Sequence, residues 1–240
     1  MPFERATAEA RRRLILSVEG RVKQGKTHFA LTAPAPIAIQ SLDMGLDGVV
    51  QKFQRNKVIH VASYPGITAK ELKTLNESEV VARMSEVWEQ FVTDYEWGLA
   101  NARTVVWDTA TEAWELVRLA RLGKLGQIKP HHYTMVNMEF REIVRRAENS
   151  NTNLLLLHRL KKEYVNNEST GKWERAGFSD IGSWVHVLAR VYRAEDGFHL
   201  TVQDCRQNAQ LWGMDLPEPM ATFPELAQLV FPDSKPEDWA

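Results

Sequence analysis

The 240-residue sequence contains almost no cysteine, and that scarcity excludes several classes of protein. Cys205 is the only cysteine, so the chain can form neither an internal disulfide nor a zinc cluster of several cysteines. No apolar stretch reaches the length of a membrane span, and the first residues lack the apolar run of a signal peptide. We therefore expect a protein of a reducing cytoplasm with no membrane partner.

Net charge is nearly absent as well. The formal charge is −1 at pH 7, which provides no overall attraction to nucleic acid. The charges are unevenly distributed, however, because basic residues gather between Arg118 and Arg146 and acidic residues predominate after Met214. Such local asymmetry matters more to a binding partner than the net figure.

Apolar, strand-like runs alternate with helical patterns along most of the chain. Strands are expected at residues 13–18, 37–42, 58–62, 104–107, 153–157, 184–192 and 199–205. Helices are expected at 26–32, within 68–97, at 111–122 and 133–147, and near 225–230. The polar stretch 161–179 has little apolar pattern and is expected to be a loop. This alternation predicts an α/β fold, a mostly parallel twisted sheet flanked by helices.

Residues 20–27 match the phosphate-loop pattern G-x-x-x-x-G-K-[ST] at every position. Glycines let successive backbone N–H groups face the phosphates, and the start of the following helix adds a positive potential. The charge of Lys26 would lie on the β- and γ-phosphates, so ATP is the expected cofactor. The expected nucleotide-binding residues are Gly20, Arg21, Val22, Lys23, Gln24, Gly25, Lys26, Thr27 and His28.

A phosphate loop works with Mg²⁺, held by the hydroxyl of Thr27 and by a carboxylate at the end of a neighbouring strand. Asp108 follows the apolar run 104–107 and is the expected carboxylate, although many such aspartates only cap the next helix. Asp43 follows another apolar run and is expected to polarise the attacking water; its alternative role is that of a turn residue. The cofactors predicted are therefore ATP and Mg²⁺.

With these motifs in this order, the chain resembles the RecA-like recombinases, and most closely the small RecA-like P-loop ATPases of bacteriophages that promote single-strand annealing. The resemblance covers roughly residues 14–212 and implies a single RecA-like domain. It places Asp43 at the position of the family's catalytic glutamate and Asp108 on its magnesium strand. It also places His158 at the polar sensor of the γ-phosphate, and residues 177–193 at the helix and strand that follow. The catalytic residues implied are Lys26, Asp43, Asp108 and His158.

The resemblance further implies two loops that contact single-stranded DNA, at residues 123–132 and 159–179. Basic side chains there would follow phosphates, and aromatic ones would stack on bases. The alternative is a pair of solvated surface loops. The DNA-binding residues implied are Lys124, Lys129, Arg159, Lys161, Lys162, Tyr164, Lys172, Trp173 and Arg175.

A homo-oligomer, ring or filament, is also implied, with Arg206 as the one basic residue that reaches a neighbouring subunit's ATP. The aspartate at position 43 is shorter than the family's glutamate, which predicts slow hydrolysis. We expect an ATPase core at 1–213, an acidic, proline-rich tail at 214–240, and location in the host cytoplasm if a phage encodes the chain. A phage or host single-strand-binding protein is a further expected partner.

Two other functions stay open. A P-loop small-molecule kinase needs an arginine-bearing lid, and the basic region 118–146 could serve as one. A helicase or packaging motor subunit is the other, although a clear arginine finger is not visible in the sequence. The adjacent pair His131 and His132 does not predict a metal site, because no carboxylate cluster accompanies it.

Overall fold

A mixed sheet of nine strands forms the centre of the computed structural model, which describes residues 12–43, 45–124, 129–166 and 168–239. The strand order is β3-β2-β4-β5-β1-β7-β8-β9, and β6 pairs with β5 outside this path. The strands are β1 (Ile15–Gly20), β2 (Ile37–Ser41), β3 (Ile59–Ser63), β4 (Thr104–Asp108), β5 (Asn153–Val165), β6 (Glu168–Arg175), β7 (Val187–Ala194), β8 (Gly197–Cys205) and β9 (Asp215–Pro217).

The pairings that join β3, β2, β4, β5, β1 and β7 are all parallel, whereas β6, β8 and β9 are added antiparallel. The expected mostly parallel sheet is therefore confirmed. Parallel strands of this kind are covered on both faces, which is why they read as continuous apolar runs. Residues 154–157 of β5, four consecutive leucines, are all fully buried.

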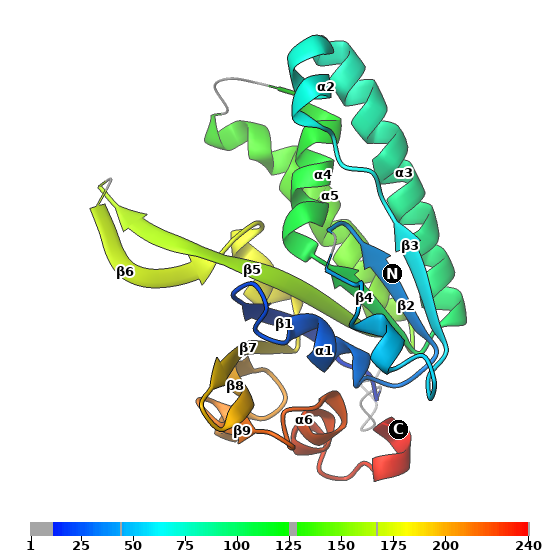
Figure 1. Cartoon of the computed structure of the whole chain (residues 1–240), viewed down its shortest axis with the longest axis vertical. Helices are drawn as coiled ribbons and strands as arrows, with labels where there is room; N and C mark the ends of the chain where they lie inside the picture. Colours follow the sequence, from blue (N-terminus) through cyan, green and yellow to red (C-terminus); the bar gives the residue numbers. More distant parts are fainter. Residues whose placement is uncertain (1–11, 44, 125–128, 167, 240) are drawn as a thin grey trace, which may run out of the picture.

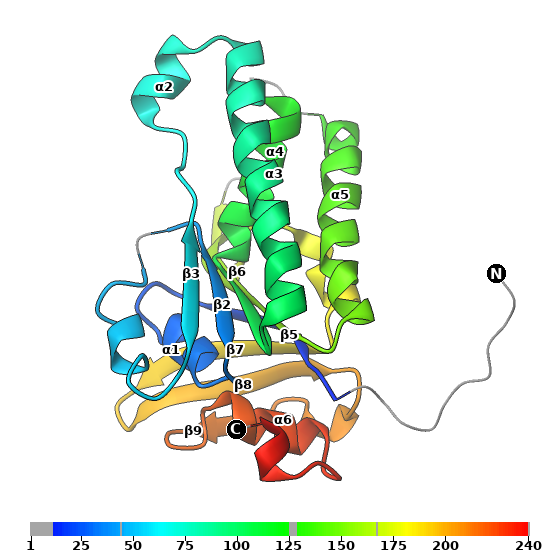
Figure 2. The same ribbon diagram turned by 90° about the vertical axis from the view of Figure 1, so that its right-hand side faces the viewer.

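Helices cover both faces of the sheet. They are α1 (Lys26–Leu31), α2 (Ala69–Thr74), α3 (Glu77–Asn101), α4 (Ala110–Leu122), α5 (Tyr133–Arg146) and α6 (Phe223–Val230). Helices α3, α4 and α5 stand side by side on one face, and α6 lies on the other side of the sheet (Figures 1 and 2). None of the helices in the described ranges is long and apolar enough to cross a membrane.

The alternation of side chains along each strand produces two separate cores. Val105 and Trp107 of β4 pack with α3, α4 and α5, whereas Val106 between them packs with α1 and α6. In β5, Leu154 and Leu156 likewise belong to the first core. Strands β1, β2 and β4 are buried throughout, whereas the edge strand β3 is half-exposed. The ends of the buried central strands carry the site described below.

The stretch 68–97 contains the expected long helix, α3, and the short helix α2 precedes it. Thr68 caps α2 and Asn76 caps α3, each through a capping box in which a glutamate three residues later bonds back to the cap. Leu75 lies between them with an extended ψ of 144°. The sequence pattern N-x-x-E at Asn76 is the signal that could have located this second helix start.

The expectation of a loop at 161–179 is wrong for most of that stretch. β5 continues to Val165 and pairs with β6 as an antiparallel hairpin that projects from the body of the molecule (Figure 1). The next expected strand also begins late, because residues 179–184 form a short 3-10 helix before β7. We call residues 160–175 the β5–β6 hairpin below.

The acidic segment after residue 213 packs onto the sheet. β9 pairs with β8, and Phe223, Leu226 and Val230 of α6 are buried in the second core. Trp239 is also buried and stacks on Phe231. The expected boundary between the ATPase core and the tail, after residue 213, therefore falls between two paired strands, β8 and β9.

Candidate nucleotide-binding site

The phosphate loop joins the end of β1 to the start of α1. Gly25 has a φ of 93°, a left-handed conformation that favours glycine. A Cβ at Gly20 would lie 2.8 Å from the carbonyl oxygen of Val191, and one at Gly25 would lie 2.9 Å from the ring of Phe198. Both glycines are thus required by close approach as well as by the loop's curl.

Lys26 lies under this loop and is largely buried. Its Nζ donates hydrogen bonds of 2.9 Å to the carbonyl oxygens of Gly20 and Arg21. Burial lowers the pKa of Lys26, and the carboxylates of Asp108 and Asp43 oppose that decrease. The ammonium group is therefore held at the loop, between the residues that would face a phosphate chain.

Thr27, in the first turn of α1, meets Asp108, the last residue of β4. Oγ1 of Thr27 donates to Oδ2 of Asp108 across 2.7 Å, and burial raises the pKa of Asp108 to about 6. A hydroxyl and a carboxylate in contact are hard oxygen ligands suited to Mg²⁺, which binds through one or two carboxylates plus phosphates and water. Within the described ranges no group of three or more His, Cys, Asp or Glu could hold a metal alone, so these residues fit an ion shared with a nucleotide.

Asp43 faces the same cavity from the end of β2. Its Oδ2 accepts from Arg159 at 3.1 Å, and its Oδ1 accepts from the backbone N–H of Gly45 at 2.8 Å. Arg159 also pairs with Glu112. Asp43 therefore lies at the rim of the cavity, and its bond to Gly45 is also the contact of a turn residue, so its action on a water stays a prediction.

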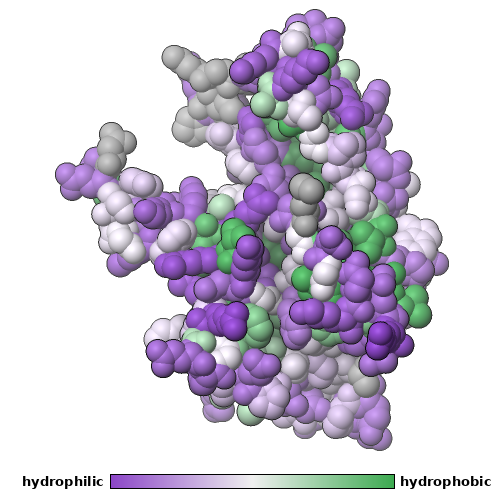
Figure 3. Space-filling model, viewed as in Figure 1, coloured by the Kyte–Doolittle hydropathy of each residue, from purple (hydrophilic) through white to green (hydrophobic). Residues whose placement is uncertain are grey.

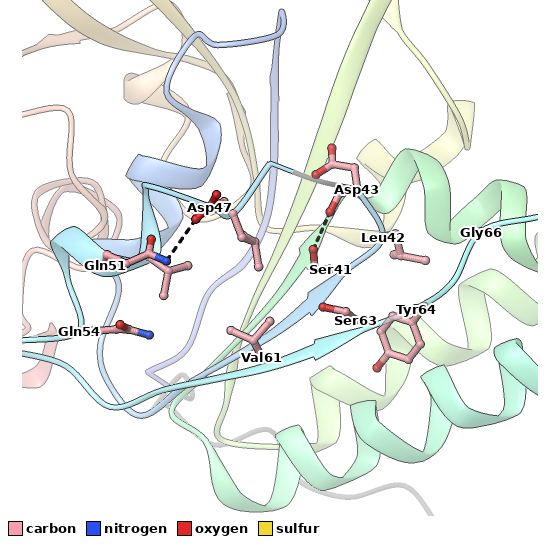
Figure 4. A pocket seen from close by; sticks show the side chains of 12 residues that line it. Ser41, Leu42, Asp43, Asp47, Gln51, Gln54, Val61, Ser63, Tyr64 and Gly66 are labelled. Atoms are coloured by element: carbon pink, nitrogen blue, oxygen red, sulfur yellow. Dashed lines mark hydrogen bonds between the residues drawn. The ribbon is translucent and has the colours of Figure 1, made fainter. Parts of the chain in front are cut away.

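These residues line one cavity of about 590 Å³. The rest of its lining was not expected from the sequence and includes Val49, Lys52, Thr109 and Phe198. A second cavity of about 610 Å³ adjoins it and shares Asp43 and Asp47 (Figure 4). Ser63, Val61 and Tyr64 of the β3 side face into this second cavity.

His158 lies deeper than its expected role requires. Its ring is completely buried, and neither nitrogen has a hydrogen-bond partner of good geometry. Burial, with a smaller effect from the charge of Arg175, lowers the pKa of His158 to about 3. The imidazole is therefore neutral, and it does not line the cavity, so its action as a γ-phosphate sensor stays a prediction.

Glu19 was not identified from the sequence; it lies beside the phosphate loop at the centre of a cluster of charged side chains. It is buried, and its carboxylate accepts from Arg175 at 3.1 Å, from Nε of Arg190 at 2.7 Å and from Gln203 at 3.0 Å. A glutamate inside an otherwise apolar strand is the signal that could have revealed it, because a buried carboxylate needs partners.

The expected DNA-binding residues are found in three different environments. Arg159 and Arg175 are occupied by the carboxylates just described, a placement that does not favour DNA contact. Trp173 lies under the guanidinium of Arg21, 4.1 Å from the ring centroid. The others on the β5–β6 hairpin have exposed side chains, and these are Lys161, Lys162, Tyr164 and Lys172.

The other expected DNA loop is described only in part, because residues 125–128 lie outside the described ranges. Lys124 donates to the carbonyl oxygen of Leu75, and Lys129 is exposed. Arg206 lies at the end of the sheet away from its own phosphate loop and donates to the carbonyl oxygen of Ser183 at 2.8 Å. Arg206 therefore cannot serve its own site, and its action on a neighbour stays a prediction.

The fold and the phosphate loop define a RecA-like P-loop ATPase. The chain belongs to the AAA domain family, whose model matches residues 12–210. No curated protein sequence matches the chain.

Comparison with solved structures agrees with the fold. The RadB recombinase is similar over 84% of both chains, at 11% identity and a TM-score of 0.50. A KaiC-like protein from Pyrococcus horikoshii covers 85% of this chain and 84% of its own, at 12% identity and a TM-score of 0.43. An ATPase of a bacterial type III secretion system covers 75% of this chain and 52% of its own, at 13% identity and a TM-score of 0.46.

Proposed function

We propose that this chain is an ATP-dependent, single-stranded-DNA-binding protein that promotes recombination or strand annealing, of the type that phages encode. The observation that carries the proposal is the β5–β6 hairpin, a projecting element with exposed lysines and an exposed tyrosine that begins directly beside the nucleotide cavity (Figure 1). The proposal includes a homo-oligomer in which Arg206 lies near the ATP of a neighbouring subunit. It also includes action with a single-strand-binding protein in the host cytoplasm.

Four of the cavity residues have a role in the proposed hydrolysis. Lys26 would bind the β- and γ-phosphates, and Thr27 with Asp108 would hold Mg²⁺, which supplies positive charge to the phosphate oxygens. Asp43 accepts a hydrogen bond from the water that attacks the γ-phosphorus, while the bond to the β-phosphate oxygen breaks. Arg159 positions Asp43 through their ion pair. Asp43 is one methylene shorter than a glutamate and would reach less far towards that water, so we expect slow turnover.

The hairpin has the composition of a single-strand contact surface. Lys162 and Lys172 expose ammonium groups that can neutralise phosphates. Tyr164 is 60% exposed, and any base can stack on its ring. Figure 3 shows the projecting hairpin as a predominantly hydrophilic surface.

The test compares DNA binding by hairpin variants. Lys162→Glu with Lys172→Glu should weaken binding to a labelled single strand at least tenfold, because two phosphate contacts become repulsive. ATP affinity should stay within twofold of the parent. The matched control is Lys70→Glu with Lys73→Glu on α2, which makes the same charge change on exposed residues elsewhere. Equal loss in both double variants, or none in either, would contradict a DNA-binding hairpin.

A small-molecule kinase is the second candidate, and one observation favours it. The cavity in Figure 4 adjoins the nucleotide cavity at Asp43, where a kinase would hold the phosphate acceptor. Its polar lining includes Ser41, Ser63 and Gln51. A kinase would turn ATP over only when an acceptor is supplied, whereas the proposed protein releases inorganic phosphate without one.

A further inference from the structure

The nucleotide cavity continues past the phosphate-binding residues into an aromatic end. Phe198, from the start of β8, lies nearly parallel to the ring of His28, with centroids 6.0 Å apart and an interplanar angle of 15°. Phe53 meets the same His28 ring edge-on at 5.0 Å. His28 and Phe198 both line the cavity, and Val49 and Lys52 line it as well.

The two ends of the cavity differ in chemistry. One end holds two bonded pairs: Thr27 donates to Asp108, and Arg159 pairs with Asp43. The carboxylates make this end suitable for Mg²⁺ and the γ-phosphate. The groups that act electrostatically on His28 are instead Lys52 and Glu218. A nucleotide whose γ-phosphate lies among the carboxylates must direct its nucleoside away from them, towards His28.

Phe198 is held firmly enough to act as a recognition surface. Its ring contacts the phosphate loop itself, since a Cβ on Gly25 would lie 2.9 Å from Cδ1 of Phe198. Its backbone N–H donates to Oε2 of Glu218 at 3.2 Å, and the guanidinium of Arg193 lies 5.6 Å from its ring centroid. The ring is half-buried, so part of it stays open to the cavity.

We propose that Phe198 and His28 form the nucleoside subsite of this ATPase, with Phe198 binding the base by stacking. The subsite rests on the proposed nucleotide function and specifies its substrate class, a purine nucleoside triphosphate. An aromatic face binds a base through the area of the base's ring system and does not contact the edge of the base. The larger purines should therefore bind more tightly than pyrimidines, and the affinities for ATP and GTP should differ little.

The test separates the base from the phosphates. Binding of Mg²⁺–ATP and of Mg²⁺–tripolyphosphate, an inorganic chain with no nucleoside, is measured by calorimetry for the parent and for Phe198→Leu. Leucine keeps the apolar contact with Gly25 and removes the aromatic face. ATP affinity should fall about tenfold, as expected for loss of one base–aromatic stack, while tripolyphosphate affinity stays within twofold. The parent's preference for ATP and GTP over CTP should disappear in the same variant.

Two variants serve as references. Phe198→Tyr keeps the ring and should keep the parent's affinity for ATP. Trp212→Leu removes an aromatic residue that is 75% exposed and does not line the cavity, and both affinities should be unchanged.

Three other results would contradict the assignment of Phe198 to the nucleoside subsite. An equal loss of ATP and tripolyphosphate affinity would mean that Phe198 only supports the phosphate loop, and unchanged ATP affinity would mean that the base lies elsewhere. In both cases the nucleotide function itself survives. A parent protein that binds neither ligand would overturn the nucleotide function together with the subsite.

Discussion

Two residues at the start of α1 and one at the end of β4 carry the chemistry that we propose for the site. Thr27 donates to Asp108, 81 positions further along the chain, and Lys26 bonds to carbonyl oxygens of the phosphate loop. Each is buried or half-buried, so it acts where electrostatic interactions are stronger than in water. Their replacement should therefore change binding and catalysis more than it changes the fold.

For Lys26→Ala we expect loss of tight ATP binding in a folded protein. The ammonium group bonds only to two loop carbonyls, so its removal should cost about 1–2 kcal/mol of stability. Calorimetry with Mg²⁺–ATP measures the binding, and circular dichroism checks the fold. Lys70→Ala, on exposed α2, is the control. Retained affinity in Lys26→Ala would disprove the phosphate-loop assignment.

Asp108→Asn should abolish Mg²⁺-dependent hydrolysis and yet stabilise the nucleotide-free protein at pH 8. Burial raises the pKa of Asp108 from 3.8 to about 6, so its charged form is disfavoured in the fold. The resulting stability is fully present below about pH 4 and is lost as the pH rises from about 4 to about 6, because the folded protein then holds a proton that the unfolded chain has released. The whole rise in pKa corresponds to roughly 3 kcal/mol.

The measurement is the melting temperature of parent and Asp108→Asn between pH 5 and 8, without nucleotide. The parent should lose stability relative to the variant as pH rises. Parallel curves would show that Asp108 is not a strained carboxylate. Asp43→Asn is the companion variant for catalysis, and it should slow hydrolysis while ATP binding is kept.

Glu19→Gln tests the buried charge cluster. Neutralising Glu19 leaves Arg175 and Arg190 facing each other without their shared carboxylate, and breaking a buried ion pair in this way costs about 3–5 kcal/mol. Urea denaturation measures the loss. Glu237→Gln, an exposed glutamate, should change stability by less than about 0.5 kcal/mol. If Glu19→Gln loses as little stability as Glu237→Gln, water screens the charges of the cluster.

At the scale of elements, the β5–β6 hairpin is tied to the phosphate loop by direct contacts. Arg21 lies on Trp173, and Glu19, next to Gly20, pairs with Arg175. His158 lies at the same junction, opposite Glu19 in the pairing of β1 with β5. A change in the loop on nucleotide binding therefore has a physical route to the hairpin.

His158→Leu tests whether His158 is part of that route. ATP binding should be kept, while affinity for a single strand should become nearly the same with ATP, with ADP and without nucleotide. Single-strand titrations in each nucleotide state measure this. If His158 is only a core residue, the variant keeps the parent's nucleotide dependence and gains stability, because two unpartnered buried nitrogens are replaced by methyl groups.

The elements also show where the sequence was sufficient. The strand at 153–157 and the phosphate loop were predicted, because continuous apolar runs and a fixed local motif carry their own signal. The β5–β6 hairpin was not, because a water-facing hairpin has no buried face and so no apolar period. Glu19 and Phe198 were missed because their roles depend on β7 and β8 pairing beside β1, contacts between residues more than 150 positions apart.

Across the whole molecule, the two opposite ends of the sheet carry different residues. The nucleotide cavity and the hairpin lie at the ends of the parallel strands, and Arg206 lies at the other end. This separation is what a head-to-tail assembly requires, in which the far end of one subunit completes the cavity of the next. The weak net charge of −1 suits a protein whose DNA contact is confined to one element.

The proposed function is tested most directly by the rate of phosphate release from ATP, with Mg²⁺, in the presence and absence of single-stranded DNA. We expect a slow basal rate that single strands increase several-fold and that duplex of the same length increases less. Lys26→Ala should abolish phosphate release in both conditions. A basal rate unaffected by any DNA, together with no phosphate release until a small-molecule acceptor is supplied, would contradict the proposed function and favour the kinase.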